Sequence, residues 1–167
     1  MCIRDSLPLL REALVALLPQ LGAEQAIALD ALYQTQVPAT AAPVLQEIVK
    51  AGGAEGGAAA LLLGRLKAPE AVPVLVAALE EPTAVARKEL ITALGQIGDR
   101  SAAEVVAHNL YSDTPDVRAA AATALATLGS GEQVEAIDAL KGDYYQDVRL
   151  AAERTLARIG AGTEAAR

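Results

Sequence analysis

Apolar residues recur every three or four positions in much of the chain, as they do in helices that bury one face. In the clearest stretch, 115–128, the apolar stripe consists of Val117, Ala121, Ala124, Leu125 and Leu128. A shorter apolar stretch at 101–111 predicts a helix before it. The two stretches therefore predict a pair of helices joined by a tight turn.

The residues at the ends of these stretches indicate where each helix begins and stops. Thr114 is a candidate N-cap, and Pro115 suits the first helical position because its missing N–H is not needed there. Ser101 is expected to cap the first helix of the pair, and Gly129 to end the second in the left-handed conformation. The boundaries therefore agree with the hydrophobic pattern.

The same plan repeats along the chain with a fixed period. Leucines stand at 63, 94, 125 and 156, a step of 31 each time, and Arg87, Arg118 and Arg149 keep the same step. Upstream, Ala41–Leu45 resembles Ala71–Leu75 at a spacing of 30, while Gly56 takes the place of the repeat arginine. A degenerate first unit over 7–36 completes an expected all-α, right-handed solenoid of about five antiparallel helix pairs.

We expect a single repeat domain over residues 7–167, preceded by an unstructured or non-native leader at 1–6. The helix expected at Leu7–Leu18 is apolar on nearly every face, whereas terminal repeats normally have a polar outer face. Thr163–Arg167 matches the opening of another unit. These features predict a segment of a longer array, with uncapped ends that can self-associate.

Composition and charge restrict the class of function. Hydrophobic residues make up 53% of the chain, but Phe and Trp are absent and the net charge is −7. Acidic balance opposes binding to nucleic acid or to an anionic membrane. A single cysteine, Cys2, excludes an internal disulfide and multi-cysteine metal sites. No apolar run approaches the roughly 20 residues that span a bilayer, so we expect a cytoplasmic protein.

Three short motifs carry a family resemblance. They are Leu-Gly-x-Ile-Gly-Asp-x-x-Ala at 94–102, Asp-Val-Arg at 116–118 and 147–149, and Ala-x-Pro-x-Leu at 71–75. Together they resemble the short HEAT-like repeats named after the phycobilisome lyases. The resemblance covers 63–160 well and 37–62 weakly. Repeats of this kind occur both in bilin lyases and in scaffolds.

The resemblance implies that the repeat arginines form a structural ladder with aspartates of a preceding turn or an adjacent unit. The expected ladder consists of Arg87, Arg118, Arg149, Asp116 and Asp147, with Asp113 and Asp143 as further candidate partners. Arg87 lacks a matching aspartate because Val85 stands at that position. The competing interpretation, an anion-binding track of arginines, is weaker because even spacing suits a ladder.

Candidate catalytic groups lack the surroundings that chemistry requires. His108 is the only histidine, and Ala77 and Ala139 occupy its place in neighbouring units. The acidic pairs Glu80–Glu81 and Asp143–Asp147 fall at helix ends and turns, where acids favour the helix dipole. Gly52–Gly57 lacks the Lys-Ser/Thr of a phosphate loop, so it is expected to be a flexible turn. We therefore expect no catalytic residue, no metal and no cofactor.

The resemblance places the second helix of each pair on the concave, binding side. Projecting the register forward gives the residues expected to contact a partner: Glu89, Thr92, Gln96, Thr123, Thr127, Arg154 and Arg158. A merely solvated face is the alternative for this surface. Tyr144–Tyr145 is either an interface contact or a turn that packs over helix ends.

The sequence thus predicts a non-catalytic scaffold that binds a helix or extended segment of another protein. The alternative is a bilin-lyase-like, enzyme-associated subunit that handles a chromophore or its acceptor protein. A DNA-binding HEAT-like protein is disfavoured because Lys and Arg do not cluster with aromatic residues.

Overall fold

The computed structural model describes residues 12–21, 24–34, 37–81, 84–129 and 131–164, and all regular structure in these ranges is helical. Residues 12–17 form a helix. The helices that follow are α2 (Gln25–Gln34), α3 (Ala42–Ala51), α4 (Gly53–Leu66), α5 (Val72–Glu80), α6 (Arg87–Ile97), α7 (Ala103–His108), α8 (Pro115–Leu128), α9 (Val134–Ala139) and α10 (Gln146–Glu164). The predicted all-α solenoid of five helix pairs is confirmed.

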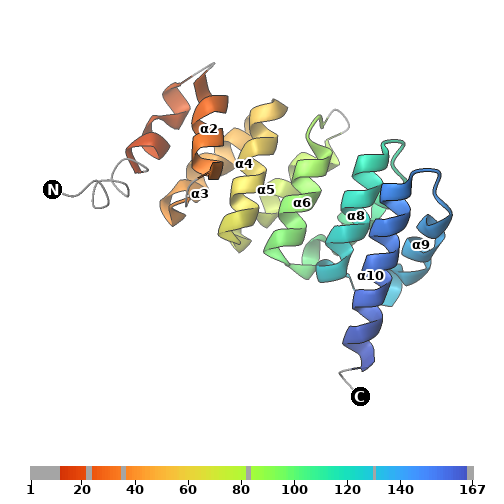
Figure 1. The fold of residues 1–167 in the computed structure, drawn as a ribbon. Helices are drawn as coiled ribbons and strands as arrows, with labels where there is room; N and C mark the ends of the chain where they lie inside the picture. Colours follow the sequence, from red (N-terminus) through yellow and green to blue (C-terminus); the bar gives the residue numbers. More distant parts are fainter. Residues whose placement is uncertain (1–11, 22–23, 35–36, 82–83, 130, 165–167) are drawn as a thin grey trace.

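The helices form two layers, and the chain alternates between them (Figure 1). The second helices α4, α6, α8 and α10 stand side by side, and each packs against the next. The first helices α3, α5, α7 and α9 lie behind them. The core between the layers is aliphatic, and its largest fully buried members include Leu45, Leu63, Leu75, Leu94, Leu110 and Leu125. Burial of these side chains is the main force that holds the stack together.

Small residues let the second helices approach one another closely. A Cβ atom on Gly95 of α6 would lie only 2.9 Å from the Cα of Ala124 in α8. The same type of contact joins Gly64 of α4 to Ala93 of α6. The alanine-rich composition therefore determines the spacing of this layer.

The helix ends partly differ from the sequence-based expectation. Pro115 lies in the first turn of α8, as expected, but the Thr114 side chain makes no cap hydrogen bond. Asp99 rather than Ser101 caps the first helix of its unit, because its carboxylate accepts the Ser101 N–H at 2.9 Å. Gly129 ends α8 in an extended conformation (φ −70°, ψ 146°) and is not left-handed.

Gly52–Gly57 is only partly a turn. Gly52 and Gly53 have φ of 78° and 73°, which is a conformation that glycine adopts readily, but α4 already begins at Gly53. Gly57 is buried in α4, and a Cβ atom there would meet the Ala86 Cβ at 2.7 Å. Most of this glycine-rich segment is thus a tightly packed helix start.

Some expectations fall outside the described residues. The leader at 1–6 is one of them, and the helix expected at Leu7–Leu18 is described only from residue 12 onward. The last residues of the expected further unit, 165–167, are also outside. In the ranges that the structure describes, none of the helices has the length and apolar character needed to cross a bilayer.

Candidate protein-binding groove and arginine ladder

The outward sides of α6, α8 and α10 form a continuous groove with a volume of about 730 Å³. Its floor includes many small residues, such as Gly95, Ala120 and Ala151, while Leu94 and Leu125 of the same helices are buried in the core. Six of the seven residues predicted to contact a partner line it: Thr92, Gln96, Thr123, Thr127, Arg154 and Arg158. The structure therefore gathers most of the predicted surface on one face, hereafter the α6–α10 groove.

Glu89, the seventh residue, does not line the α6–α10 groove. Its side chain lies toward α4, where a Cβ atom on Gly57 would be 3.4 Å from the Glu89 Cβ. Close packing of α4 against α6 therefore keeps Glu89 out of the groove.

The threonines of the groove donate their hydroxyl protons to the backbone. Thr92 Oγ1 donates to the Lys88 carbonyl at 2.7 Å, and Thr123 Oγ1 donates to the Ala119 carbonyl at 2.8 Å. Thr127 Oγ1 is 2.9 Å from the Gly95 carbonyl on the neighbouring helix. These side chains can thus offer a partner methyl groups and acceptor oxygens, while side-chain donors come from Gln96 and the arginines.

The charges of the groove are separated along α10. Asp147 lies at the start of the helix, whereas Arg154 and Arg158 lie two and three turns further along it. Among the described residues, these two arginines make no ion pair or hydrogen bond. The groove therefore has exposed guanidinium groups that a carboxylate or carbonyl of a partner could contact.

Sequence reasoning missed an ion pair at the edge of this groove. Lys88 Nζ on α6 lies 3.0 Å from Asp116 Oδ2 on α8, and both side chains are more than half exposed, at 52% and 65%. The hydrogen bond with Asp116 raises the pKa of Lys88 above its usual value. The opposite charges of Lys88 and Asp116 could have suggested this pair. The two residues are not one repeat apart, however, so the repeat register does not match them.

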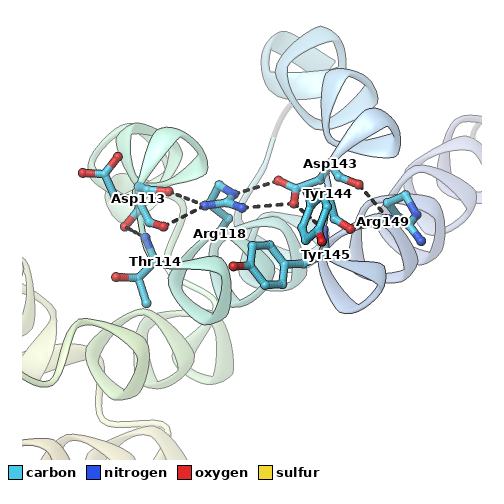
Figure 2. A network of polar contacts seen from close by, with 8 residues as sticks. Asp113, Thr114, Arg118, Asp143, Tyr144, Tyr145 and Arg149 are labelled. Carbon is cyan, nitrogen blue, oxygen red and sulfur yellow. Dashed lines mark hydrogen bonds and ion pairs between the residues drawn. The ribbon is translucent and has the colours of Figure 1, made fainter.

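The arginine ladder lies at the turns that join the helices (Figure 2), and none of its arginines lines the groove. Arg118 Nε and Nη2 donate to Asp143 of the next unit at 2.8 and 3.0 Å. Its Nη1 donates to the carbonyls of Ser112 and Asp113 at 2.6 and 3.2 Å. This side chain therefore joins the end of one first helix to the turn of the following unit.

The ion pair is well shielded from water, with Arg118 and Asp143 side chains only 15% and 9% exposed. The hydrogen bonds from Arg118 hold the pKa of Asp143 below its usual value, and those to Asp143 raise the pKa of Arg118. Tyr145 covers one side, with its ring centroid 5.9 Å from the Arg118 Cζ. The contact is favourable as a cation–π interaction.

The other repeat arginines adopt the same position with different partners. Arg149 Nη1 donates to the carbonyls of Asp143 and Tyr144 at 2.7 and 2.9 Å. Arg87 donates to the carbonyls of Leu79 and Glu81, and its Nη1 lies 3.5 Å from Asn109 Oδ1. Arg87 thus has a partner in the next unit although the expected aspartate is missing.

The aspartates expected in the ladder lie elsewhere. Asp116 pairs with Lys88, and Asp147 lines the α6–α10 groove. The physical reason is helical geometry: each is two residues before its arginine, so the two side chains point to different sides of the helix. Asp143, in the turn before α10, lies on the side that the Arg118 guanidinium faces.

The remaining candidates do not form a shared site. His108 is exposed at the end of α7. Glu80 and Glu81 line different pockets, and Asp143 is bound by Arg118 whereas Asp147 faces the groove. Within the described residues, no three His, Cys, Asp or Glu side chains gather as a metal site would require.

Tyr144 and Tyr145 contact each other edge to face, with ring centroids 5.3 Å apart. Tyr145 packs on Arg118, as noted above, whereas Tyr144 is 88% exposed. One tyrosine therefore covers the ladder, and the other is presented to the solvent.

Stacked antiparallel helix pairs joined by an inter-unit ladder define an α-solenoid. The chain matches the family described as HEAT repeats over residues 56–126, and that described as PBS lyase HEAT-like repeat over residues 117–142. These matches identify HEAT-like repeats within residues 56–142. A comparison with curated proteins found no match. HEAT repeats generally mediate protein interactions.

Proposed function

We propose that this chain is a non-catalytic scaffold, and that its α6–α10 groove binds a helix or an extended segment of another protein. The observation that carries the proposal is the groove itself, which is continuous across the three neighbouring second helices α6, α8 and α10. Small residues at its floor allow the backbone of a partner to come close. The exposed Arg154 and Arg158 at one end favour a segment whose carboxylates align with them.

The test is selection of binding peptides from a displayed random library, with the whole chain as bait. A groove variant carries Thr123→Glu, Arg154→Glu and Arg158→Glu. A matched control carries Ala139→Glu, Arg100→Glu and Lys141→Glu, which change the charge equally at exposed positions on or beside the first helices. Affinities of the selected peptides are then measured by calorimetry for all three proteins.

We expect selected peptides to be enriched in Asp and Glu, and to bind the control as tightly as the native chain. The groove variant should bind them at least about tenfold more weakly, since two attractive charges become repulsive. Equal binding to the groove variant would contradict the assignment of this surface. Circular dichroism of each variant checks that the helices persist.

A second candidate function is a subunit that handles a bilin chromophore or its acceptor protein. The match to the PBS lyase HEAT-like repeat over residues 117–142 supports it. Mixing the chain with a free bilin would then produce a shifted absorption band. Comparing this band for the groove variant and the control would show which surface the bilin contacts. An unchanged bilin spectrum would leave the scaffold as the better proposal.

A further inference from the structure

The ladder position is occupied by glycine in one unit. A step of 31 leads from Arg118 to Arg87 and then to Gly56, in the first turn of α4. The same step leads from Asp143, the acceptor in the ladder, to Ser112 and then to Glu81. The α3–α4 pair therefore lacks the arginine, while Glu81 stands at the acceptor position.

A pocket of about 570 Å³ lies at this place, between the α3–α4 pair and the α5–α6 pair. Arg118 binds Ser112, Asp113 and Asp143. The equivalent positions two repeats upstream, each 62 residues earlier, are Lys50, Ala51 and Glu81. All three of these residues line the pocket, and so does Gly56. The pocket thus corresponds to the space that Arg118 fills two units later (Figure 2).

The walls of this pocket suit a planar cation on an aliphatic stem. Carbonyls at the C-terminal end of α3 carry partial negative charge, and Glu81 adds a carboxylate. Most of the remaining lining is apolar, including Pro73, Ala77 and Val85, and Val85 is 82% exposed at the rim. The nearby Lys50 ammonium is bound to Glu47 at 2.6 Å, so it does not supply the cation.

We propose that this pocket binds an arginine side chain of a partner protein, whose guanidinium takes the place that Arg118 has in the ladder and pairs with Glu81. The chain itself shows the geometry of such an occupant at Arg118. The pocket shares no lining residue with the α6–α10 groove. The arginine contact is therefore a second docking point, independent of the groove.

The probe is the blocked tripeptide acetyl-Ala-Arg-Ala-amide, added to the full chain and followed by amide chemical shifts in NMR spectra. Its control is the same peptide with citrulline, which keeps the shape of the side chain but is neutral. We expect saturable shifts within residues 49–57 and 73–90 for the arginine peptide only. Glu81→Gln should weaken binding about fivefold.

Gly56→Arg should abolish binding of the peptide because its own side chain would enter the pocket. The substitution has room, since a Cβ atom on Gly56 would meet nothing closer than the Ile48 carbonyl oxygen at 3.4 Å. Gly56→Ala is the matched control and should retain binding. Equal shifts with the citrulline peptide, or the absence of saturable shifts in the native chain, would overturn the proposal.

The groove variant separates this proposal from the proposed function. Its three substitutions lie outside the pocket, so it should bind the arginine peptide with native affinity. If it loses that binding while Gly56→Arg retains it, the peptide binds in the groove and the pocket assignment is wrong.

Discussion

The guanidinium of Arg118 and the carboxylate of Asp143 form a two-point ion pair between the fourth and fifth helix pairs, with N–O distances of 2.8 and 3.0 Å. Both side chains are largely buried, and Arg118 also binds two backbone carbonyls. Apolar burial is non-directional, whereas a two-point ion pair is directional. This contact therefore specifies how the last two units are aligned.

Removal of the arginine should be costly. We expect Arg118→Ala to lower the free energy of unfolding by about 3 kcal/mol, since Asp143 would remain buried without its partner. Lys88→Ala is the control, because it breaks an exposed pair and should cost less than about 1 kcal/mol. Urea unfolding measures both. Similar losses for the two variants would show that the ladder contributes no more than a surface ion pair.

The Arg118–Asp143 ion pair should also make the free energy of unfolding depend on pH. Arg118 lowers the pKa of Asp143 in the folded chain, so the unfolded chain binds more protons as the pH falls. The contribution of Asp143 is full above its unfolded pKa of about 4 and is lost as the pH falls through the lower folded pKa.

Asp143→Asn tests this dependence, since it cannot titrate. Its unfolding free energy, measured by urea from pH 6 downward, should fall less steeply than that of the native chain. Some slope should persist, because the Ser101 N–H also lowers the pKa of Asp99. Parallel curves for the two proteins would contradict the role of Asp143.

Two glycines in second helices should respond oppositely to alanine. A Cβ atom at Gly95 would lie 2.8 Å from the Ala124 Cβ, so Gly95→Ala should destabilise the chain by about 1–3 kcal/mol. At Gly56 the nearest atom is 3.4 Å away, so Gly56→Ala should stabilise it by up to about 1 kcal/mol through helix propensity. Thermal unfolding distinguishes the signs, and stabilisation by Gly95→Ala would contradict the close helix packing.

Ser112 is at the ladder position that Asp143 has in the next unit. Both side chains accept the N–H two residues later, from Thr114 and Tyr145 respectively. Ser112→Asp should keep this contact and give Arg87 a carboxylate partner, raising the unfolding free energy by about 1 kcal/mol. Ser112→Asn is the uncharged control in urea unfolding. A gain of the same size with Asn would point to the turn rather than to Arg87.

Much of the groove could be predicted from the sequence because residues one repeat apart occupy equivalent positions on parallel helices. The period of 31 and the helical spacing therefore placed Thr92, Thr123 and Arg154 on one face without any knowledge of contacts. Their role in binding stays a prediction. Glu89 was placed with them because the pattern alone does not show how closely α4 packs against α6.

The sequence by itself determined the helix pairs, their number and the faces that become buried, since these follow from local hydrophobic periodicity and from repetition. Only the tertiary structure decided which aspartate binds Arg118, because the actual partner, Asp143, is 25 residues away while Asp113 and Asp116 are closer in sequence. It also decided that Gly56 borders a pocket, because a missing side chain has an effect only once two units are packed together. Local interactions can be read from the spacing of apolar and polar residues, whereas distances between units depend on how the helices pack against one another.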